Sequence, residues 1–175
     1  ETLKVPVGYS LLGRTINAVG KPCDNLGEII PETYYPAVQI APDAMTKLEI
    51  NKRITTGVRA IDSMLTIGKG QRIGIFAGSG VGKSTIMGMI ARNTNADINV
   101  IGLIGERGRE VLDFINRDLG PEGMKRSVVV VAKGDEPAIC KMRAAQVCTA
   151  VAEFFRDKGK DVMLMMDSVT RFCHA

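Results

Sequence analysis

Four runs of apolar residues with the length of β-strands punctuate the chain from residue 71 onward. They are rich in Val, Ile, Leu and Met without polar alternation, and they occupy residues 71–77, 97–104, 127–132 and 161–166. A strand that is apolar on both faces is typical of a parallel sheet covered by helices on both sides. The pattern therefore predicts four strands of such a sheet.

Longer amphipathic segments lie between these runs and predict helices over residues 85–93, 109–118 and 137–157. A repeated order of strand, helix and strand predicts right-handed crossovers and a doubly wound sheet. We therefore expect an α/β fold whose sheet is mainly parallel.

The first 50 residues differ from the rest in composition. Most of the prolines fall there, glycines punctuate the segment, and helical periodicity is absent. Such a composition favours short strands and turns. We expect a short β-rich lead-in over residues 1–50 and the α/β core over residues 51–175.

A glycine-rich stretch, Phe-Ala-Gly-Ser-Gly-Val-Gly-Lys-Ser-Thr over residues 76–85, separates the first predicted strand from the first predicted helix. A loop in this position directs backbone N–H groups and a helix N-terminus to one point, which suits a phosphate group. Lys83 would add a positive charge toward the terminal phosphates, and Ser84 would offer a hydroxyl to Mg²⁺.

The alternative is a plain turn that contains Gly-Lys-Ser, and Ala77 stands where the usual pattern of such loops begins with glycine. The predicted order of strand, loop and helix favours the phosphate interpretation. The residues that would form the phosphate site are Gly78, Ser79, Gly80, Val81, Gly82, Lys83, Ser84 and Thr85.

An aspartate, Asp167, directly follows the last apolar run. A carboxylate at the end of a strand near a phosphate loop can hold Mg²⁺, whereas an isolated aspartate there can equally cap the next turn. The presence of the glycine loop earlier in the chain favours the metal role, with Ser84 as the second candidate ligand.

Glu106 follows the second apolar run, at the sheet edge where open α/β folds bind ligands, and could orient a water molecule. The residues alone leave two alternatives open. Glu106 could belong to a solvated charge cluster with Arg107 or Arg109, and Glu110 is a competing carboxylate.

Composition narrows the function classes. The 175 residues are 45% hydrophobic and 24% charged, as in an ordinary globular protein, and the apolar runs are too short to span a bilayer. Four scattered cysteines and one histidine argue against a zinc site or a disulfide framework. The net charge of +4 is spread along the chain and only 5% of residues are aromatic, so we expect no nucleic-acid partner. We expect a cytoplasmic protein.

Three stretches carry a family resemblance. The sequence Ile-Gly-Lys-Gly-Gln-Arg-Ile-Gly-Ile-Phe-Ala leads into the glycine loop, Gly-Leu-Ile-Gly-Glu-Arg-Gly-Arg-Glu spans residues 102–110, and Met-Met-Asp-Ser-Val-Thr-Arg spans residues 165–171. With them the chain closely resembles the ATPases of bacterial flagellar protein export. These are similar in turn to the ATPases of type III secretion injectisomes and to the catalytic subunit of rotary ATP synthases. The amino-acid sequence of the glycine loop resembles the flagellar enzymes more than the other two groups.

The resemblance implies a RecA-like P-loop core that binds ATP and Mg²⁺ and hydrolyses ATP to power the export of flagellar proteins. It implies that Glu106 activates water, that Arg107 approaches the terminal phosphate, and that Asp167 lies beside Mg²⁺. It further implies a homohexamer at the cytoplasmic face of a membrane-embedded export apparatus, peripheral to the membrane, with export-apparatus proteins, cargo and chaperones as partners.

By the same resemblance, an N-terminal barrel, the rest of the core and a C-terminal helical domain lie outside this chain. The arginine that a neighbouring subunit inserts would also lie outside it, and such a residue is worth roughly 10³ to 10⁵ in rate. We therefore expect the isolated chain to bind nucleotide better than it hydrolyses it.

Two functions of other classes compete with this one. A hexameric nucleic-acid motor would need basic loops and aromatic residues for base stacking, which are sparse here. A non-catalytic nucleotide sensor would not need Glu106 together with Lys83.

Overall fold

Four parallel strands form the central sheet, in the order β2-β7-β6-β8. The computed structural model describes residues 3–78 and 80–175. The bounds of these strands are β2 Thr15–Asn17, β6 Ile98–Glu106, β7 Ser127–Lys133 and β8 Val162–Asp167. The α/β fold and the parallel sheet predicted from the sequence are confirmed.

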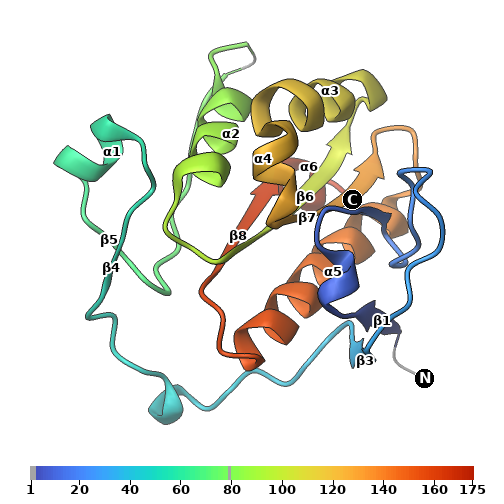
Figure 1. Ribbon diagram of the computed structural model, residues 1–175, viewed down its shortest axis with the longest axis horizontal. Coiled ribbons are helices and arrows are strands. Elements are labelled where there is room, and N and C mark those ends of the chain that lie inside the picture. The colour runs from blue at the N-terminus through green and yellow to red at the C-terminus, as the bar shows by residue number, and fades with distance from the viewer. Residues whose placement is uncertain (1–2, 79) are drawn as a thin grey trace.

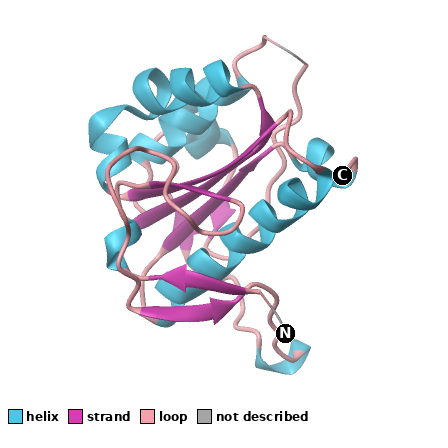
Figure 2. Ribbon diagram, turned by 90° about the vertical axis from the view of Figure 1, so that its right-hand side faces the viewer, coloured by secondary structure: helices cyan, strands magenta, loops and turns pink. Residues whose placement is uncertain are grey.

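Helices cover both faces of this sheet (Figure 2). On one face α5 shares a core cluster with Val100 and Ile104 of β6, and on the other face α2 and the π-helix η3 share a cluster with Ile101 and Leu103. Side chains on both faces of β6 are therefore buried, which explains why polar and apolar residues do not alternate along this strand. The helix bounds are α2 Lys83–Asn93, α3 Gly108–Asp113, η3 Phe114–Leu119, α4 Gly120–Lys125, α5 Ala138–Asp157 and α6 Val169–Cys173.

The lead-in is β-rich, and it packs on α5 (Figure 1). Strands β1 and β3 pair antiparallel, and Tyr35 of β3 lies edge-on to Phe154 of α5 with ring centroids 5.6 Å apart. Strand β2 extends the central sheet beside β7. The boundary near residue 50 stays a prediction. The bounds are β1 Lys4–Val7, the 3₁₀ turn η1 Tyr9–Leu11 and β3 Thr33–Pro36.

The segment between the lead-in and the glycine loop forms only short elements, beside the sheet in Figure 1. Strands β4 and β5 make a two-stranded antiparallel pair that brackets α1. The bounds are the 3₁₀ turn η2 Ala44–Thr46, β4 Arg53–Ile54, α1 Arg59–Met64 and β5 Ile67–Gly68.

The strand predicted over residues 71–77 is wrong: this stretch is irregular. Ile73 is 49% and Phe76 97% exposed, and the Phe76 ring folds back onto Gly74, where a Cβ would lie 2.6 Å from it. Glycine weakens a strand because it costs backbone entropy and offers no side chain to pack. Within residues 3–78 and 80–175, β8 at the edge of the sheet pairs only with β6. Residues 71–77 therefore form no inter-strand hydrogen bonds with β8 that could offset this cost.

The helix predicted over residues 109–118 is present in two parts, α3 and the π-helix η3, and α4 follows without having been predicted. Six residues are too few to show a helical period, which explains the omission. The backbone of η3 meets α2 at Gly88, where a Cβ would lie 2.5 Å from the carbonyl oxygen of Asp118. No side chain separates the two helices at this point.

One arginine binds the C-terminal end of α2. The Arg126 guanidinium donates hydrogen bonds of 2.8 to 3.0 Å to the carbonyl oxygens of Ala91, Arg92, Thr94 and Ala96. Carbonyl groups at a helix C-terminus lack intrahelical partners and carry partial negative charge, so a cation there stabilises the helix.

We expect Arg126→Gln to lower the free energy of unfolding by about 2–3 kcal/mol, because several charge-assisted bonds to partly buried carbonyls are lost together. Urea unfolding of the chain followed by circular dichroism measures this loss. The control is Arg117→Gln, whose side chain is 79% exposed; a loss of equal size in both variants would refute the capping role.

Candidate active site

The glycine loop enters α2 through left-handed backbone. Gly80 has φ 78° and Gly82, the N-cap of α2, has φ 98°, conformations that favour glycine. A Cβ placed on Gly78, Gly80 or Gly82 would meet nothing within 4 Å, so the protein itself does not fill the space beside the loop. This open loop at the start of an 11-residue helix suits a phosphate group. Ser79 lies outside the described residues.

Lys83, the first residue of α2, reaches the end of β8. Its Nζ lies 2.5 Å from Oδ1 of Asp167, whose side chain is only 7% exposed. The structure thus brings together a lysine and an aspartate that are 84 positions apart in the sequence. Two of the predicted site residues are in direct contact.

Glu106 emerges beside them because β6 and β8 are neighbours, with Leu103 of β6 opposite Asp167 in the register. The pairing of β6 with β7 shifts between Ile104 and Glu106, and Gly105 adopts φ 75°. Such a bulge re-aims the following side chain. The Glu106 side chain is 14% exposed.

Burial is the main reason that the pKa of Glu106 rises from its usual 4.5 to about 7. A hydrogen bond with Glu110 and the nearby charge of Asp167 raise the pKa further, whereas Arg171 lowers it. A carboxyl group with a pKa near 7 can gain and lose a proton at neutral pH, which suits a general base.

Arg171 was missed as a site residue in the reasoning from sequence. It lies on α6, donates from Nη1 to the Gly105 carbonyl oxygen, and places the same nitrogen 2.8 Å from Oε1 of Glu106. Its position four residues after Asp167, one helical turn beyond the strand end, is the signal that could have identified it.

Arg107 and Glu110 interact with each other. Glu110 accepts from the Arg107 backbone N–H and guanidinium, both at 3.5 Å, and its pKa is lowered chiefly by the hydrogen bond with Glu106. The Arg107 side chain is 73% exposed, so its charge is accessible to a ligand. Of the two competing carboxylates, Glu106 is more buried than Glu110. The negative charge of Asp167 also raises the pKa of Glu106.

The remaining loop residues lie in the open. Val81 is 67% exposed, and Ser84 and Thr85 in the first turn of α2 are also exposed. Over residues 3–78 and 80–175, no group of three or more His, Cys, Asp or Glu side chains could hold a metal ion. One hydroxyl and one carboxylate fit Mg²⁺, which retains water and takes phosphate oxygens as ligands.

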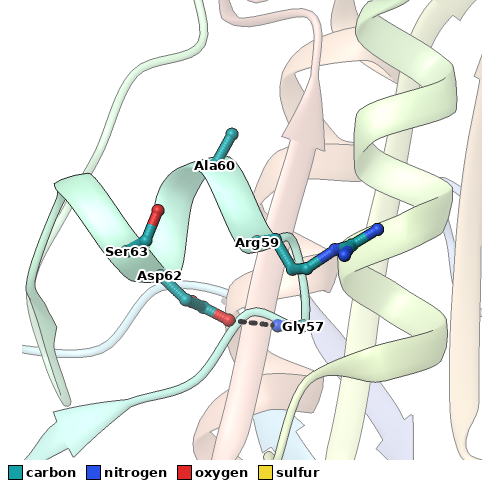
Figure 3. A pocket seen from close by; sticks show the side chains of 5 residues that line it. All are labelled: Gly57, Arg59, Ala60, Asp62 and Ser63. Atoms are coloured by element: carbon teal, nitrogen blue, oxygen red, sulfur yellow. Dashed lines mark hydrogen bonds between the residues drawn. The ribbon is translucent and has the colours of Figure 1, made fainter.

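Among the described residues, cavities open to solvent lie beside this site and on the α1 segment. One, of about 540 Å³, lies at the ends of β6 and β7 and is lined by Arg107, Lys133 and Arg171 among others. The other, of about 710 Å³, lies on the α1 segment (Figure 3). There Asp62 accepts hydrogen bonds from Thr56 and Gly57, so its carboxylate stabilises the turn before α1.

The family described as "ATP synthase alpha/beta family, nucleotide-binding domain" matches residues 57–175. The chain therefore belongs to the ATP synthase alpha/beta family. A flagellum-specific ATP synthase of Bacillus subtilis (strain 168) is 58% identical over 177 residues, covering 100% of this chain and 40% of that protein.

A type 3 secretion system ATPase of Xanthomonas euvesicatoria is 54% identical over 173 residues, covering 99% of this chain and 39% of that protein. The resemblance to flagellar and type III secretion ATPases is confirmed. The chain spans about two fifths of the length of the curated relatives that it matches.

Solved structures agree. An ATPase from the type III secretion system of pathogenic bacteria matches with TM-score 0.94 and 48% identity, over 99% of this chain and 50% of that chain. The ATPase EscN in complex with its central stalk EscO, from enteropathogenic E. coli, matches with TM-score 0.92 and 48% identity, over 98% of this chain and 42% of that chain. None of the helices within residues 3–78 and 80–175 combines the length and the hydrophobicity that a membrane-spanning helix requires.

We expect Glu106 to make the folded state less stable as pH rises. A carboxyl whose pKa is higher in the folded than in the unfolded state contributes stability below pH 4.5 that is lost as pH rises toward 7. Relative to Glu106→Gln, the wild-type chain should lose about 1–2 kcal/mol between pH 5 and pH 8, measured by urea unfolding at each pH.

The matched control is Glu122→Gln, since the Glu122 side chain is 80% exposed. A difference between wild type and Glu106→Gln that stays constant with pH would show that Glu106 does not titrate in this range.

Proposed function

We propose that this chain is the nucleotide-binding core of an ATPase that hydrolyses ATP with Mg²⁺ and powers the export of flagellar proteins through a type III secretion apparatus. The observation that carries the proposal is the convergence of the glycine loop, the Lys83–Asp167 contact and Glu106 at one edge of the sheet. Relatives named as flagellum-specific ATP synthases and type 3 secretion ATPases support it.

The glycine loop and Lys83 bind the phosphates of ATP in this proposal. Backbone N–H groups at the start of α2, next to the open space beside the loop, donate to phosphate oxygens. The Lys83 ammonium, held near this space by Asp167, turns its charge to the terminal phosphates.

Ser84 and Asp167 would hold Mg²⁺ in this proposal. The ion, when bound with ATP, neutralises charge on the phosphate oxygens. The Asp167 carboxylate contacts Lys83 and is only 7% exposed, so its burial would limit competition from bulk water for a bound ion.

The Glu106 carboxylate orients the attacking water by accepting a hydrogen bond from it. Its pKa of about 7 leaves a substantial ionised fraction at neutral pH. Arg107, exposed beside Glu106, contacts the terminal phosphate and offsets its negative charge.

The intact protein acts as a homohexamer at the cytoplasmic face of the export apparatus, with export-apparatus proteins, cargo and chaperones as partners. Assembly of a structural relative supports the oligomer, since EscN has been solved in an assembled form and with a central stalk. A subunit of an injectisome ATPase is the nearest alternative, and the 54% identity to such an enzyme shows how close it is. A rotary synthase subunit or a nucleic-acid motor is less favoured.

Lys83→Ala should weaken binding of MgATP and MgADP by about 10- to 100-fold, because charge-assisted bonds to phosphate are worth about 1.5–3 kcal/mol. Isothermal titration calorimetry on this chain measures the affinities. Lys125→Ala, which removes a lysine whose side chain is 70% exposed, serves as the control. Equal affinities in wild type and Lys83→Ala would refute the nucleotide site.

Asp167→Asn separates the metal role of the carboxylate from its contact with Lys83. We expect the variant to weaken MgADP binding about tenfold more than binding of ADP in EDTA, because only the former needs a charged metal ligand. The comparison uses calorimetry with exposed Asp113→Asn as control. Equal losses with and without Mg²⁺ would assign Asp167 to Lys83 alone.

A further inference from the structure

The arginine on α6 holds the bulge from which Glu106 emerges. Arg171 Nη1 binds both the Gly105 carbonyl oxygen and the Glu106 carboxylate, so one guanidinium joins two consecutive residues of β6. A charge-assisted bond of this kind is about twice as strong as a neutral one and fixes direction. The side chain of Arg171 thus contacts the group proposed to orient water.

The neighbouring backbone is shaped to admit this arginine. A Cβ on Gly105 would lie 2.7 Å from Cδ and 3.1 Å from Cβ of Arg171, so the stem of the arginine fills the place where a side chain would stand. The Ser168 hydroxyl caps α6 by accepting a hydrogen bond from the Arg171 backbone N–H at 3.3 Å. Both contacts set the direction from which the guanidinium reaches β6.

The charges around Glu106 leave Arg171 as its partner cation. Arg107 pairs with Glu110, and Lys83 pairs with Asp167. The charged groups around Glu106 are Glu110 on α3, Arg107 at the N-cap of α3, Asp167 on β8, Lys133 opposite Glu106 on β7 and Arg171 on α6. Of the ion pairs that the described residues form, the one from Glu106 goes to Arg171.

We propose that Arg171 is a positioning residue that holds the Glu106 carboxylate in place for the attack of water on ATP. The inference rests on the proposed function, in which Glu106 orients water. Arg171 thus affects the rate of the chemical step indirectly, by positioning Glu106.

The test measures steady-state MgATP hydrolysis by the intact protein. We expect Arg171→Gln to lower kcat by about tenfold or more while KM for MgATP and the affinity for MgADP stay within about twofold. The Arg171 cation lowers the pKa of Glu106, so its removal should raise that pKa. The rising limb of the plot of kcat against pH should therefore move to higher pH. Arg117→Gln, an exposed arginine on η3, should change none of these quantities.

Arg171→Lys keeps the charge and serves where Arg171→Gln fails to fold. It should lose less kcat than Arg171→Gln and leave the pH profile in place. A raised KM with unchanged kcat would overturn the proposal, because the guanidinium would then bind nucleotide. An unchanged kcat and pH profile in both variants would also overturn it.

Failure of the proposed function gives a different result. If the unmodified intact protein hydrolyses no MgATP and this chain binds none, the ATPase proposal fails. If the unmodified protein is active and the Arg171 variants match it, only the role of Arg171 fails.

Discussion

The parallel pairing of β6 with β8 is the constraint on which the site depends. It places Leu103 opposite Asp167, so that Glu106, three residues further along β6, emerges beside the aspartate. The core on both faces of β6 fixes this register, because a slip by one residue would exchange Ile101 with Val100 between two differently shaped clusters. The position of the carboxylates is therefore maintained by apolar packing far larger than the site itself.

Charge at this edge is nearly balanced within the protein. Asp167 has Lys83, Glu110 has Arg107, and Glu106 has Arg171. Lys83 and Arg171 compensate the two largely buried carboxylates, Asp167 and Glu106, whose desolvation would otherwise be costly. A polyanion that enters must exchange these internal pairs for its own contacts, and the cations are already in place to make them. The affinity for phosphate and the stability of the free protein thus depend on the same residues.

Much of this arrangement could be predicted from the sequence, because buried parallel strands and glycine loops leave a local signature. The strands that contain Val100 and Val129 and the helix that starts near Lys83 were predicted within one or two residues. The strand over residues 71–77 was wrong because its apolar pattern says nothing about whether a neighbour is present to pair with it. The role of Arg171 could not be predicted, because its ion pair with Glu106 depends on how α6 packs against the end of β6 and has no local signature. The roles of the catalytic and metal residues remain predictions.

The contact at Gly88 has a mechanical consequence. Because the backbones of α2 and η3 touch with no compressible side chain between them, the two helices resist relative sliding as a rigid pair. The glycine loop precedes α2, and η3 continues back through α3 to Arg107, which directly follows Glu106. A displacement of α2 at Gly88 would therefore press directly on the backbone of η3 at Asp118.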